Sequence, residues 1–600
     1  MKRFLGRIEG ARFRCWPAPE RHWQCRVLWR GYLANRDDIL AQARQRHVRL
    51  RGGSDAELMA LAYRWWGEAT ASRLLGEYAL AIYYEPTSSL FLTNDSFGLL
   101  PLFYNRSAQG LVFGSHLEDL VAETGVGVLD EDFIADYVAS CFHPPERTPY
   151  RAIRRLEFGH SATWNGHEFR VVRTWRPDGT APPAISDREY EEQFRSLLND
   201  AVTQALRADG PVWSELSGGL DSSSVVCVGA RSGERRLEAI SLVYDRYAQA
   251  DESPWMRSVL AQYRVPWHVI DGDAVLPFAE LPDRFCAEPG LPMIDWSYRR
   301  RYQALVEQNG VAAVLTGQGG DLVFFGAGTE PYYLADLARG LELVQLWSQL
   351  RRWQSADRRK RSLLHWAVNY VLQPLFGAMR KPPLRAGWRP DTSPWIDGDY
   401  ARRMALDERG GRLLSSDHAT IDQGWCFDAL VRLCGRVANL NQIPQRFAFR
   451  HPLLYRPLVE FMLALPPDQK FDPRADRFLQ RRALEGILPE PLRQRREKTI
   501  FDQPFYEGLR NGKAWISALT SAPRVVDRGI VDREQWPEAV ARARLGHTHS
   551  LAQFQAIATL EIWLQQLEGQ IASGPVPLVL DEHGPSVEHH ASRNGDTHDH

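Results

Sequence analysis

The spacing of apolar residues divides the chain into a strand-rich first third and a later part in which helices alternate with short apolar runs. Residues 78–84 and 90–93 are apolar and aromatic, and a polar turn separates them. This arrangement predicts a β-hairpin. The same rhythm continues at residues 101–104 and 111–113, and residues 55–66 have a helical pattern. We therefore predict an α+β sandwich of short antiparallel strands.

The pattern changes after a proline- and glycine-rich linker at residues 176–183, which predicts a domain boundary. Short apolar runs at residues 211–213, 239–243 and 311–315 then lie between helical stretches. Such runs predict buried parallel strands, as in a doubly wound α/β domain. After about residue 326 the chain is expected to be mostly helical.

Three segments are therefore expected along the chain. Residues 1–185 form the first domain, residues 186–573 form the second, and residues 574–600 form a tail. The tail loses its apolar character and contains several histidines without regular spacing. A disordered tail is the expectation, and a metal-binding tail is the alternative.

Composition excludes several classes of protein. The chain has 600 residues and a formal net charge of −1, so a general nucleic-acid or membrane-surface binder, which needs a basic excess, is disfavoured. No apolar stretch is long enough for a transmembrane helix, and the charged start has no apolar run behind it. The seven cysteines are scattered without metal-ligand spacing, which indicates reduced thiols in the cytoplasm.

The most informative segment is Ser-Gly-Gly-Leu-Asp-Ser-Ser at residues 217–223, between an apolar run and a helical stretch. Two glycines let the backbone turn tightly, and the following helix start presents N–H groups to an anion. An ionised aspartate suits Mg²⁺ rather than a bare phosphate. No lysine follows, so this is not a Walker A sequence. The alternative is a Gly-Gly turn before a serine-capped helix. The nucleotide-binding candidates are Ser217, Gly218, Gly219, Asp221, Ser222 and Ser223.

This string resembles the pyrophosphate loop of the N-type ATP pyrophosphatases, in particular the asparagine synthetase group. In that group ATP is split between its α and β phosphates and the acid substrate becomes an acyl-adenylate. A second glycine-rich string, residues 315–326, resembles the second nucleotide and metal loop of the group. The resemblance implies that Thr316 and Gly317 contact the nucleotide and that Asp321 and Asp221 bind Mg²⁺. It also places adenine near residues 241–243, which include Val243.

A third segment, residues 496–501, resembles the late basic segment of the family, in which a lysine contacts the phosphates. Lys498 is therefore expected to stabilise charge in the transition state. Residues 451–458 resemble another landmark of the family, with Tyr455 where aspartate is usual, and we interpret them as structural. The catalytic candidates are Lys498, Asp221 and Asp321.

The first domain also resembles the family at residues 94–104 and 113–117, and the implied fold is an Ntn-type glutaminase-like sandwich. Glutamine hydrolysis in the family depends on a cysteine directly after the initiator methionine. This sequence has Lys2 there, and Cys15 is internal. Without that nucleophile there is no amidase chemistry. The domain is therefore expected to be degenerate. For the whole chain, the resemblance implies this sandwich followed by a doubly wound, parallel-sheet ATP pyrophosphatase domain with a helical C-terminal part.

Gln318 is a second departure, because asparagine synthetases usually have glutamate here and the β-lactam-forming relatives have tyrosine. Glutamine cannot act as a general base, but a primary α-amine with a pKa of about 7.7–8.0 needs no strong base. This combination resembles the lasso peptide cyclases, or macrolactam synthetases. These bacterial, cytoplasmic enzymes adenylate an Asp or Glu side chain of a precursor peptide, and its N-terminal amine closes the ring.

The resemblance implies ATP and Mg²⁺ as cofactors, and a lasso precursor peptide, a leader peptidase and a leader-binding protein as partners, with no nucleic acid or membrane. Residues 326–425 are expected to supply a peptide groove, and ordinary packing is the alternative role for their aromatic residues. The candidates for that groove are Trp347, Trp353, Trp366, Trp388 and Trp395. Three other functions stay open: an asparagine synthetase or β-lactam-type synthetase, an inactive nucleotide-binding scaffold, and a tRNA-modifying pyrophosphatase, which the neutral charge disfavours.

Overall fold

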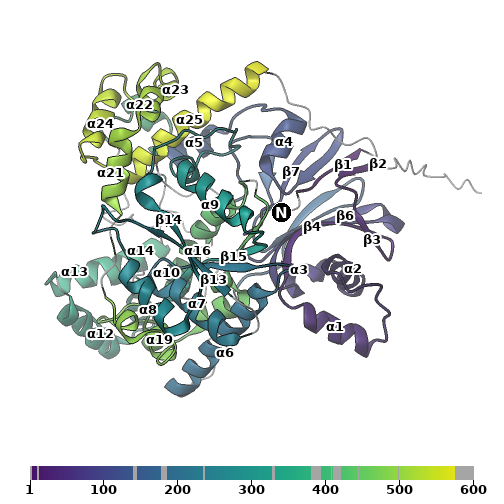
Figure 1. Ribbon diagram of the computed structural model, residues 1–600, viewed down its shortest axis with the longest axis horizontal. Helices are drawn as coiled ribbons and strands as arrows, with labels where there is room; N and C mark the ends of the chain where they lie inside the picture. Colours follow the sequence, from purple (N-terminus) through teal and green to yellow (C-terminus); the bar gives the residue numbers. More distant parts are fainter. Residues whose placement is uncertain are drawn as a thin grey trace, which may run out of the picture. The chain divides into compact units, whose positions relative to one another are not determined.

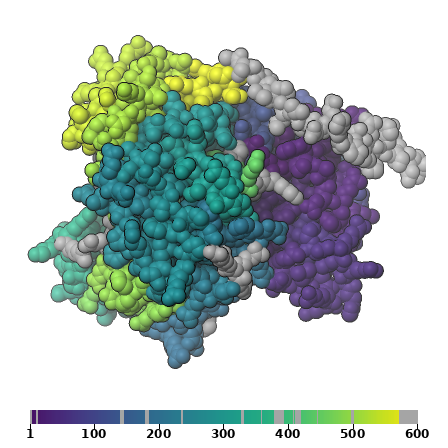
Figure 2. Space-filling view, in the orientation of Figure 1, coloured from purple at the N-terminus to yellow at the C-terminus, as the bar shows by residue number. Residues whose placement is uncertain are grey.

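The computed structural model of the chain forms two compact units (Figures 1 and 2). Each unit has its own hydrophobic core. Unit 1 comprises residues 1–130, 145–176 and 570–600, and unit 2 comprises residues 131–144 and 177–569. The chain crosses from the first unit to the second within the predicted linker. The structure describes residues 3–9, 12–139, 145–177, 185–233, 237–326, 331–357, 359–379, 393–406, 409, 420–443, 445–496, 499 and 501–573.

Two sheets and a small set of helices build unit 1. The first sheet has the order β2 (Arg12–Trp16), β1 (Leu5–Glu9), β8 (Gly110–Gly114), β7 (Phe103–Ser107) and β9 (Ile153–Arg155). The second sheet has the order β11 (Phe169–Arg173), β10 (His160–Trp164), β6 (Ser89–Asn94), β5 (Gly76–Tyr84), β4 (Cys25–Leu33) and β3 (Glu20–His22). The helices of this unit are α1 (Arg36–Gln45), α2 (Asp55–Trp66), α3 (Thr70–Arg73) and α4 (Leu117–Thr124).

Strand β5 shows how the alternation of side chains makes the layers of unit 1. Ala81 and Tyr83 share a core with Ile8 and Phe113 of the other sheet. The intervening residue Ile82 packs instead in a core with the helix residues of α2. Successive strand residues point to opposite faces, so one face of the second sheet covers the first sheet and the other face covers a helix. The predicted hairpin (β5 and β6), the helix at 55–66 and the antiparallel sandwich are confirmed.

A five-stranded parallel sheet lies at the centre of unit 2. Its order is β14 (Trp267–Asp271), β13 (Leu237–Val243), β12 (Val212–Glu215), β15 (Ala313–Leu315) and β16 (Ala448–Arg450). The chain runs outward from β12 through β13 and β14, then returns to the other side of β12 at β15. The strand order therefore reverses between β12 and β15. In sheets of this kind ligands bind at the carboxyl ends of the two strands that flank such a reversal.

Helices cover both faces of this sheet (Figure 1). On one face, Tyr302 and Val306 of α9 (Trp296–Gln308) pack on Trp213 and Val314. The other face is covered by α6 (Asp187–Leu206) and α7 (Leu220–Ser232). The N-terminus of α6 is well defined, because Ser186 and Glu189 form a reciprocal capping box. The expected doubly wound sheet is thus present.

The remainder of unit 2 is mostly helical, as expected. Its helices are α5 (Glu131–Val138), α8 (Ser253–Tyr263), α10 (Gly320–Val323), α11 (Tyr333–Arg339), α12 (Leu343–Ala356), α13 (Leu363–Ala367), α14 (Gln373–Met379), α15 (Gly398–Arg403), α16 (Ile421–Leu440), α17 (Arg456–Ala464), α18 (Pro467–Lys470), α19 (Phe478–Ala483), α20 (Glu490–Arg493), α21 (Asp502–Asn511), α22 (Lys513–Thr520), α23 (Arg524–Asp527), α24 (Gln535–Arg544) and α25 (Leu551–Ser573). Helix α5 groups with unit 2, although it precedes the linker. No described helix is long and apolar enough to cross a membrane. The predicted tail at 574–600 lies outside the described residues.

Candidate active site

The first loop of the site joins β12 to α7 and is held closed by its own serines. Ser217 N donates to Ser222 Oγ over 3.1 Å, and the two hydroxyls lie 2.9 Å apart. Gly219 N donates to Ser217 Oγ over 3.4 Å. Gly218 has φ +79°, a left-handed conformation that favours glycine. The two glycines and the serine pair therefore turn the chain from the strand end directly into the helix start.

The second loop follows β15 and packs on the first at glycine positions. A Cβ on Gly317 would lie 2.5 Å from Ser222 N and 2.7 Å from its Cα, and a Cβ on Gly320 would collide with the side chain of Asp221. Thr316 is buried, and its N–H donates to Arg450 O on β16 over 2.9 Å. Close approach of the two loops thus requires the glycines that the sequence supplies.

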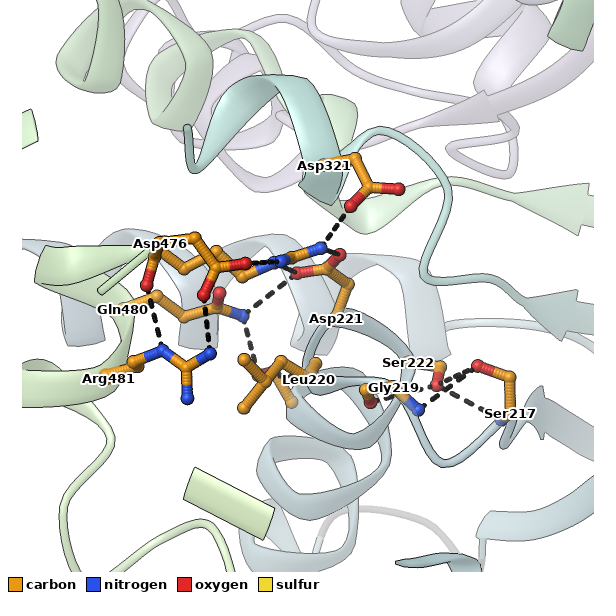
Figure 3. A network of polar contacts seen from close by, with 11 residues as sticks. Ser217, Gly219, Leu220, Asp221, Ser222, Asp321, Asp476, Gln480 and Arg481 are labelled. Carbon is orange, nitrogen blue, oxygen red and sulfur yellow. Dashed lines mark hydrogen bonds and ion pairs between the residues drawn. The ribbon is translucent and has the colours of Figure 1, made fainter. Parts of the chain in front are cut away.

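The two predicted metal ligands face one another across these loops (Figure 3). Arg477 joins them: its Nε donates to Asp221 Oδ1 over 2.9 Å and its Nη2 to Asp221 Oδ2 over 2.8 Å, and Nη2 also donates to Asp321 Oδ1. Gln480 Nε2 donates to Asp221 Oδ1 over 3.3 Å and to Ser224 Oγ over 2.9 Å. Burial raises the pKa of Asp221, and Arg477 opposes that rise.

These two carboxylates suit a magnesium ion that is shared with phosphates. Mg²⁺ is commonly held by one or two carboxylates together with substrate phosphate oxygens, rather than by an all-protein cage. One guanidinium nitrogen already contacts both Asp221 and Asp321, so a single cation can bridge them. Among the described residues no group of three or more His, Cys, Asp or Glu side chains forms a metal site. The remaining ligands would therefore come from the nucleotide and from water.

A late segment of the chain reaches the first loop through Arg495. Its Nη1 donates to Gly218 O over 2.8 Å, and its Nη2 donates to Glu252 Oε1 over 2.6 Å and to Thr499 Oγ1 over 2.7 Å. The side chain is 8 % exposed and lies over the ring of Trp255. Lys498 itself lies outside the described residues, so its expected role stays a prediction.

Three further candidates have distinct places. Ser223 is fully buried, and its Oγ has no hydrogen-bond partner among the described residues. Gln318 lies on the second loop, and its side-chain Oε1 is likewise buried and unpartnered within that part of the chain. Val243 lies at the carboxyl end of β13, beside β12. The structure thus brings together the predicted residues of the two loops, with Val243 on the adjacent strand.

Sequence reasoning missed Arg477, Gln480 and Arg495. Arg477 and Gln480 stand in or next to the short helix α19, far from either glycine-rich string. Arg495 precedes the basic segment by one position and was not distinguished from its neighbours. In each case the deciding contact joins residues more than 200 positions apart.

The proposed peptide groove receives little support from the tryptophans. Trp353 Nε1 donates to Tyr333 OH over 2.9 Å, and its ring lies 5.4 Å from that of Trp366, which is buried. Trp395 is also buried. Trp366 and Trp395 therefore have the packing role that was the alternative expectation, while Trp353 is half-buried. Trp347 is 52 % exposed, and Trp388 lies outside the described residues.

Comparison with protein families agrees with this geometry. The asparagine synthase model matches residues 193–565, which is more than half of the chain. The chain belongs to the asparagine synthase family. A glutamine amidotransferase domain model matches residues 17–175.

Curated relatives extend this match to most of the chain. "Asparagine synthetase [glutamine-hydrolyzing] 3" of Bacillus subtilis is 24 % identical over 539 residues, which cover 85 % of this chain and 80 % of the relative. "Putative asparagine synthetase [glutamine-hydrolyzing]" of Mycobacterium bovis is 25 % identical over 550 residues, which cover 86 % of this chain and 81 % of the relative. The chain is therefore an ATP-dependent ligase that forms amide bonds.

The amidotransferase-like unit offers no activated thiol among its described cysteines. Cys15 lies within β2, where burial raises the pKa of its thiol to about 11. Burial also raises the pKa of the Cys25 thiol to about 11. A cysteine nucleophile needs a thiolate at neutral pH, which usually requires a lowered pKa. Neither thiol is prepared for glutamine hydrolysis.

Proposed function

We propose that this protein is a macrolactam synthetase of the lasso peptide cyclase type. It adenylates an Asp or Glu side chain of a precursor peptide, and the N-terminal amine of the same peptide then attacks to close an isopeptide ring. The proposal is supported by two observations: the two glycine-rich loops bring Asp221 and Asp321 together, and burial raises the pKa of both described thiols of the amidotransferase-like unit. An enzyme built this way needs an amine from a source other than glutamine.

In the first step an oxygen of the peptide carboxylate attacks the α-phosphorus of ATP, and pyrophosphate leaves. The loop at residues 217–223 presents hydroxyl and N–H donors to the phosphates at the start of α7. Asp221 and Asp321 would hold Mg²⁺, which offsets charge on the leaving pyrophosphate. Lys498 is proposed to add a further positive charge at the phosphates.

In the second step the peptide amine attacks the acyl carbon and AMP leaves with one oxygen of the original carboxylate. The amine must lose a proton, and its own pKa of about 7.7–8.0 leaves a useful neutral fraction at pH 7–8. Gln318 Oε1 is buried without a hydrogen-bond partner among the described residues, so it can accept a hydrogen bond from the incoming N–H. Gln318 orients the amine in this scheme and takes no proton.

A second function in the same family is an ammonia-dependent synthetase that acts on a small acid such as aspartate. It is compatible with the names of the relatives, which describe asparagine synthetases that hydrolyse glutamine. Both functions use the same adenylation step, so they differ in the acid and the amine. The raised thiol pKa values of the N-terminal unit are compatible with both functions. Neither a peptide amine nor free ammonia has to be released from glutamine.

The test supplies the purified protein with ATP and Mg²⁺ and one of two substrate sets. The first set is a linear core peptide encoded beside the gene, and the second is aspartate with ammonium. We expect AMP and a peptide product lighter by one water that resists carboxypeptidase. AMP formed only with aspartate and ammonium would replace the proposal with the small-molecule synthetase. No AMP with either set would contradict adenylation by this site.

A further inference from the structure

Arg477 contacts both of the carboxylates that would hold the metal ion. Its Nη2 contacts Asp221 and Asp321 together, and its Nη1 donates to Asp476 Oδ2 over 2.6 Å. Figure 3 shows this network of polar contacts, in which Asp221, Asp321 and Asp476 converge from separate segments. One guanidinium thus contacts three carboxylates at the centre of the site, and one of them, Asp476, also accepts from Arg481.

The fold holds Arg477 in this position. Its N–H donates to Phe325 O over 3.1 Å, which ties it to the end of the second loop, and Arg481 N donates to its carbonyl over 3.0 Å. Its side chain is 10 % exposed. Burial lowers the pKa of Arg477, but the carboxylates of Asp221 and Asp321 outweigh burial and raise it above its ordinary value. A buried guanidinium of this kind stays charged.

The three carboxylates differ in how easily they can leave Arg477. Asp221 is bound by two parallel hydrogen bonds, and its side chain is 13 % exposed. Asp476 accepts from Arg477 and from Arg481. The side chain of Asp321 is 49 % exposed, the most of the three, so it can turn toward a new cation at the lowest cost.

We infer that Arg477 is the resident cation of the metal site, which a magnesium ion enters only when nucleotide phosphates accompany it. This inference rests on the proposed adenylating function of the site. Without nucleotide, a divalent ion at Asp221 and Asp321 lies close to the fixed charge of Arg477 in a partly buried setting, where like charges repel strongly. The phosphates add the negative charge that lets both cations remain. Nη2 then leaves Asp321, while Nε keeps Asp221 oriented.

The test measures Mn²⁺ binding to the nucleotide-free full chain by electron paramagnetic resonance, so it needs no turnover. Arg477→Gln removes the charge and keeps an amide that can donate to Asp221. We expect it to bind Mn²⁺ about tenfold more tightly than the unmodified protein. Arg188→Gln is the matched control, because Arg188 pairs with Glu192 on an exposed part of α6 and takes no part in this network, and its Mn²⁺ affinity should not change. Equal or weaker Mn²⁺ binding by Arg477→Gln would overturn the inference.

A second variant decides the question if Arg477→Gln does not fold. Asp476→Asn leaves Arg477 in place with less negative charge beside it, so Mn²⁺ should bind more weakly than to the unmodified protein. Unchanged or tighter binding would reject the resident-cation role. The proposed function fails separately, through the absence of AMP. A protein that makes AMP but shows no gain of Mn²⁺ affinity in Arg477→Gln would lose this inference alone.

Discussion

Asp221 and Asp321 are the residues on which the proposed chemistry depends most directly. Replacing Asp221 by Asn keeps its size but removes the charge that holds Mg²⁺ and pairs with Arg477. We expect AMP formation to fall by about 100-fold or more, because metal-assisted charge stabilisation contributes several kcal/mol. Asp399→Asn, at an aspartate whose side chain is 80 % exposed, should retain normal activity. AMP formation by Asp221→Asn at the normal rate would place the metal elsewhere.

The raised thiol pKa of Cys15 predicts how its alkylation rate depends on pH. A thiol with a pKa of about 11 is deprotonated only as pH rises toward that value. At pH 8 roughly one Cys15 in a thousand is a thiolate, and this fraction grows about tenfold for each pH unit up to pH 10. Alkylation of Cys15 by iodoacetamide, followed by peptide mass spectrometry, should show the same rise. A half-maximal alkylation rate near pH 7 would show an activated thiol and would restore a glutaminase candidate.

The close packing of the two glycine-rich loops depends on glycine residues. The Cβ of Gly317→Ala would overlap backbone atoms of Ser222, which cannot move without displacing the start of α7. We expect the KM for ATP to rise about tenfold or more, since a displaced loop misplaces its phosphate donors. Gly435→Ala within α16 meets nothing within 4 Å and should leave this KM unchanged. An unaltered KM in Gly317→Ala would show that the loops need not pack so closely to bind ATP.

The elements that carry the site were predictable because their signals are local. Apolar runs predicted β12, β13 and β15, and the glycine-rich strings marked the turns that follow two of them. Strand β16 was missed because its three residues interrupt a helical region and pair only with β15. Arg477 could not be assigned, because its partners are set by tertiary folding and its own sequence context is an ordinary basic helix start. Composition also cannot separate a packed ring from an exposed one, so the sequence did not distinguish the buried Trp366 and Trp395 from the exposed Trp347.

A peptide substrate needs a binding surface on the protein in addition to the adenylation site. The outer face of α12 exposes Leu343, Val344 and Trp347, with Arg351 over the Trp347 ring. We predict that Trp347→Ala raises the KM for the core peptide several-fold and leaves the KM for ATP unchanged, because an exposed aromatic contributes contact area without supporting the core. Leu545→Ala, at another exposed apolar residue of unit 2, is the control and should change neither. An unchanged peptide KM in Trp347→Ala would remove α12 from peptide binding.

In the proposed mechanism a carboxylate becomes an adenylate before the amide bond forms. The most direct measurement uses a core peptide whose acceptor carboxylate carries oxygen-18, with ATP, Mg²⁺ and the purified protein, and follows the label in the released nucleotide by mass spectrometry. Attack of the carboxylate on the α-phosphorus predicts AMP that contains one heavy oxygen, together with a cyclised peptide. Unlabelled AMP, or ADP with labelled inorganic phosphate, would contradict the account.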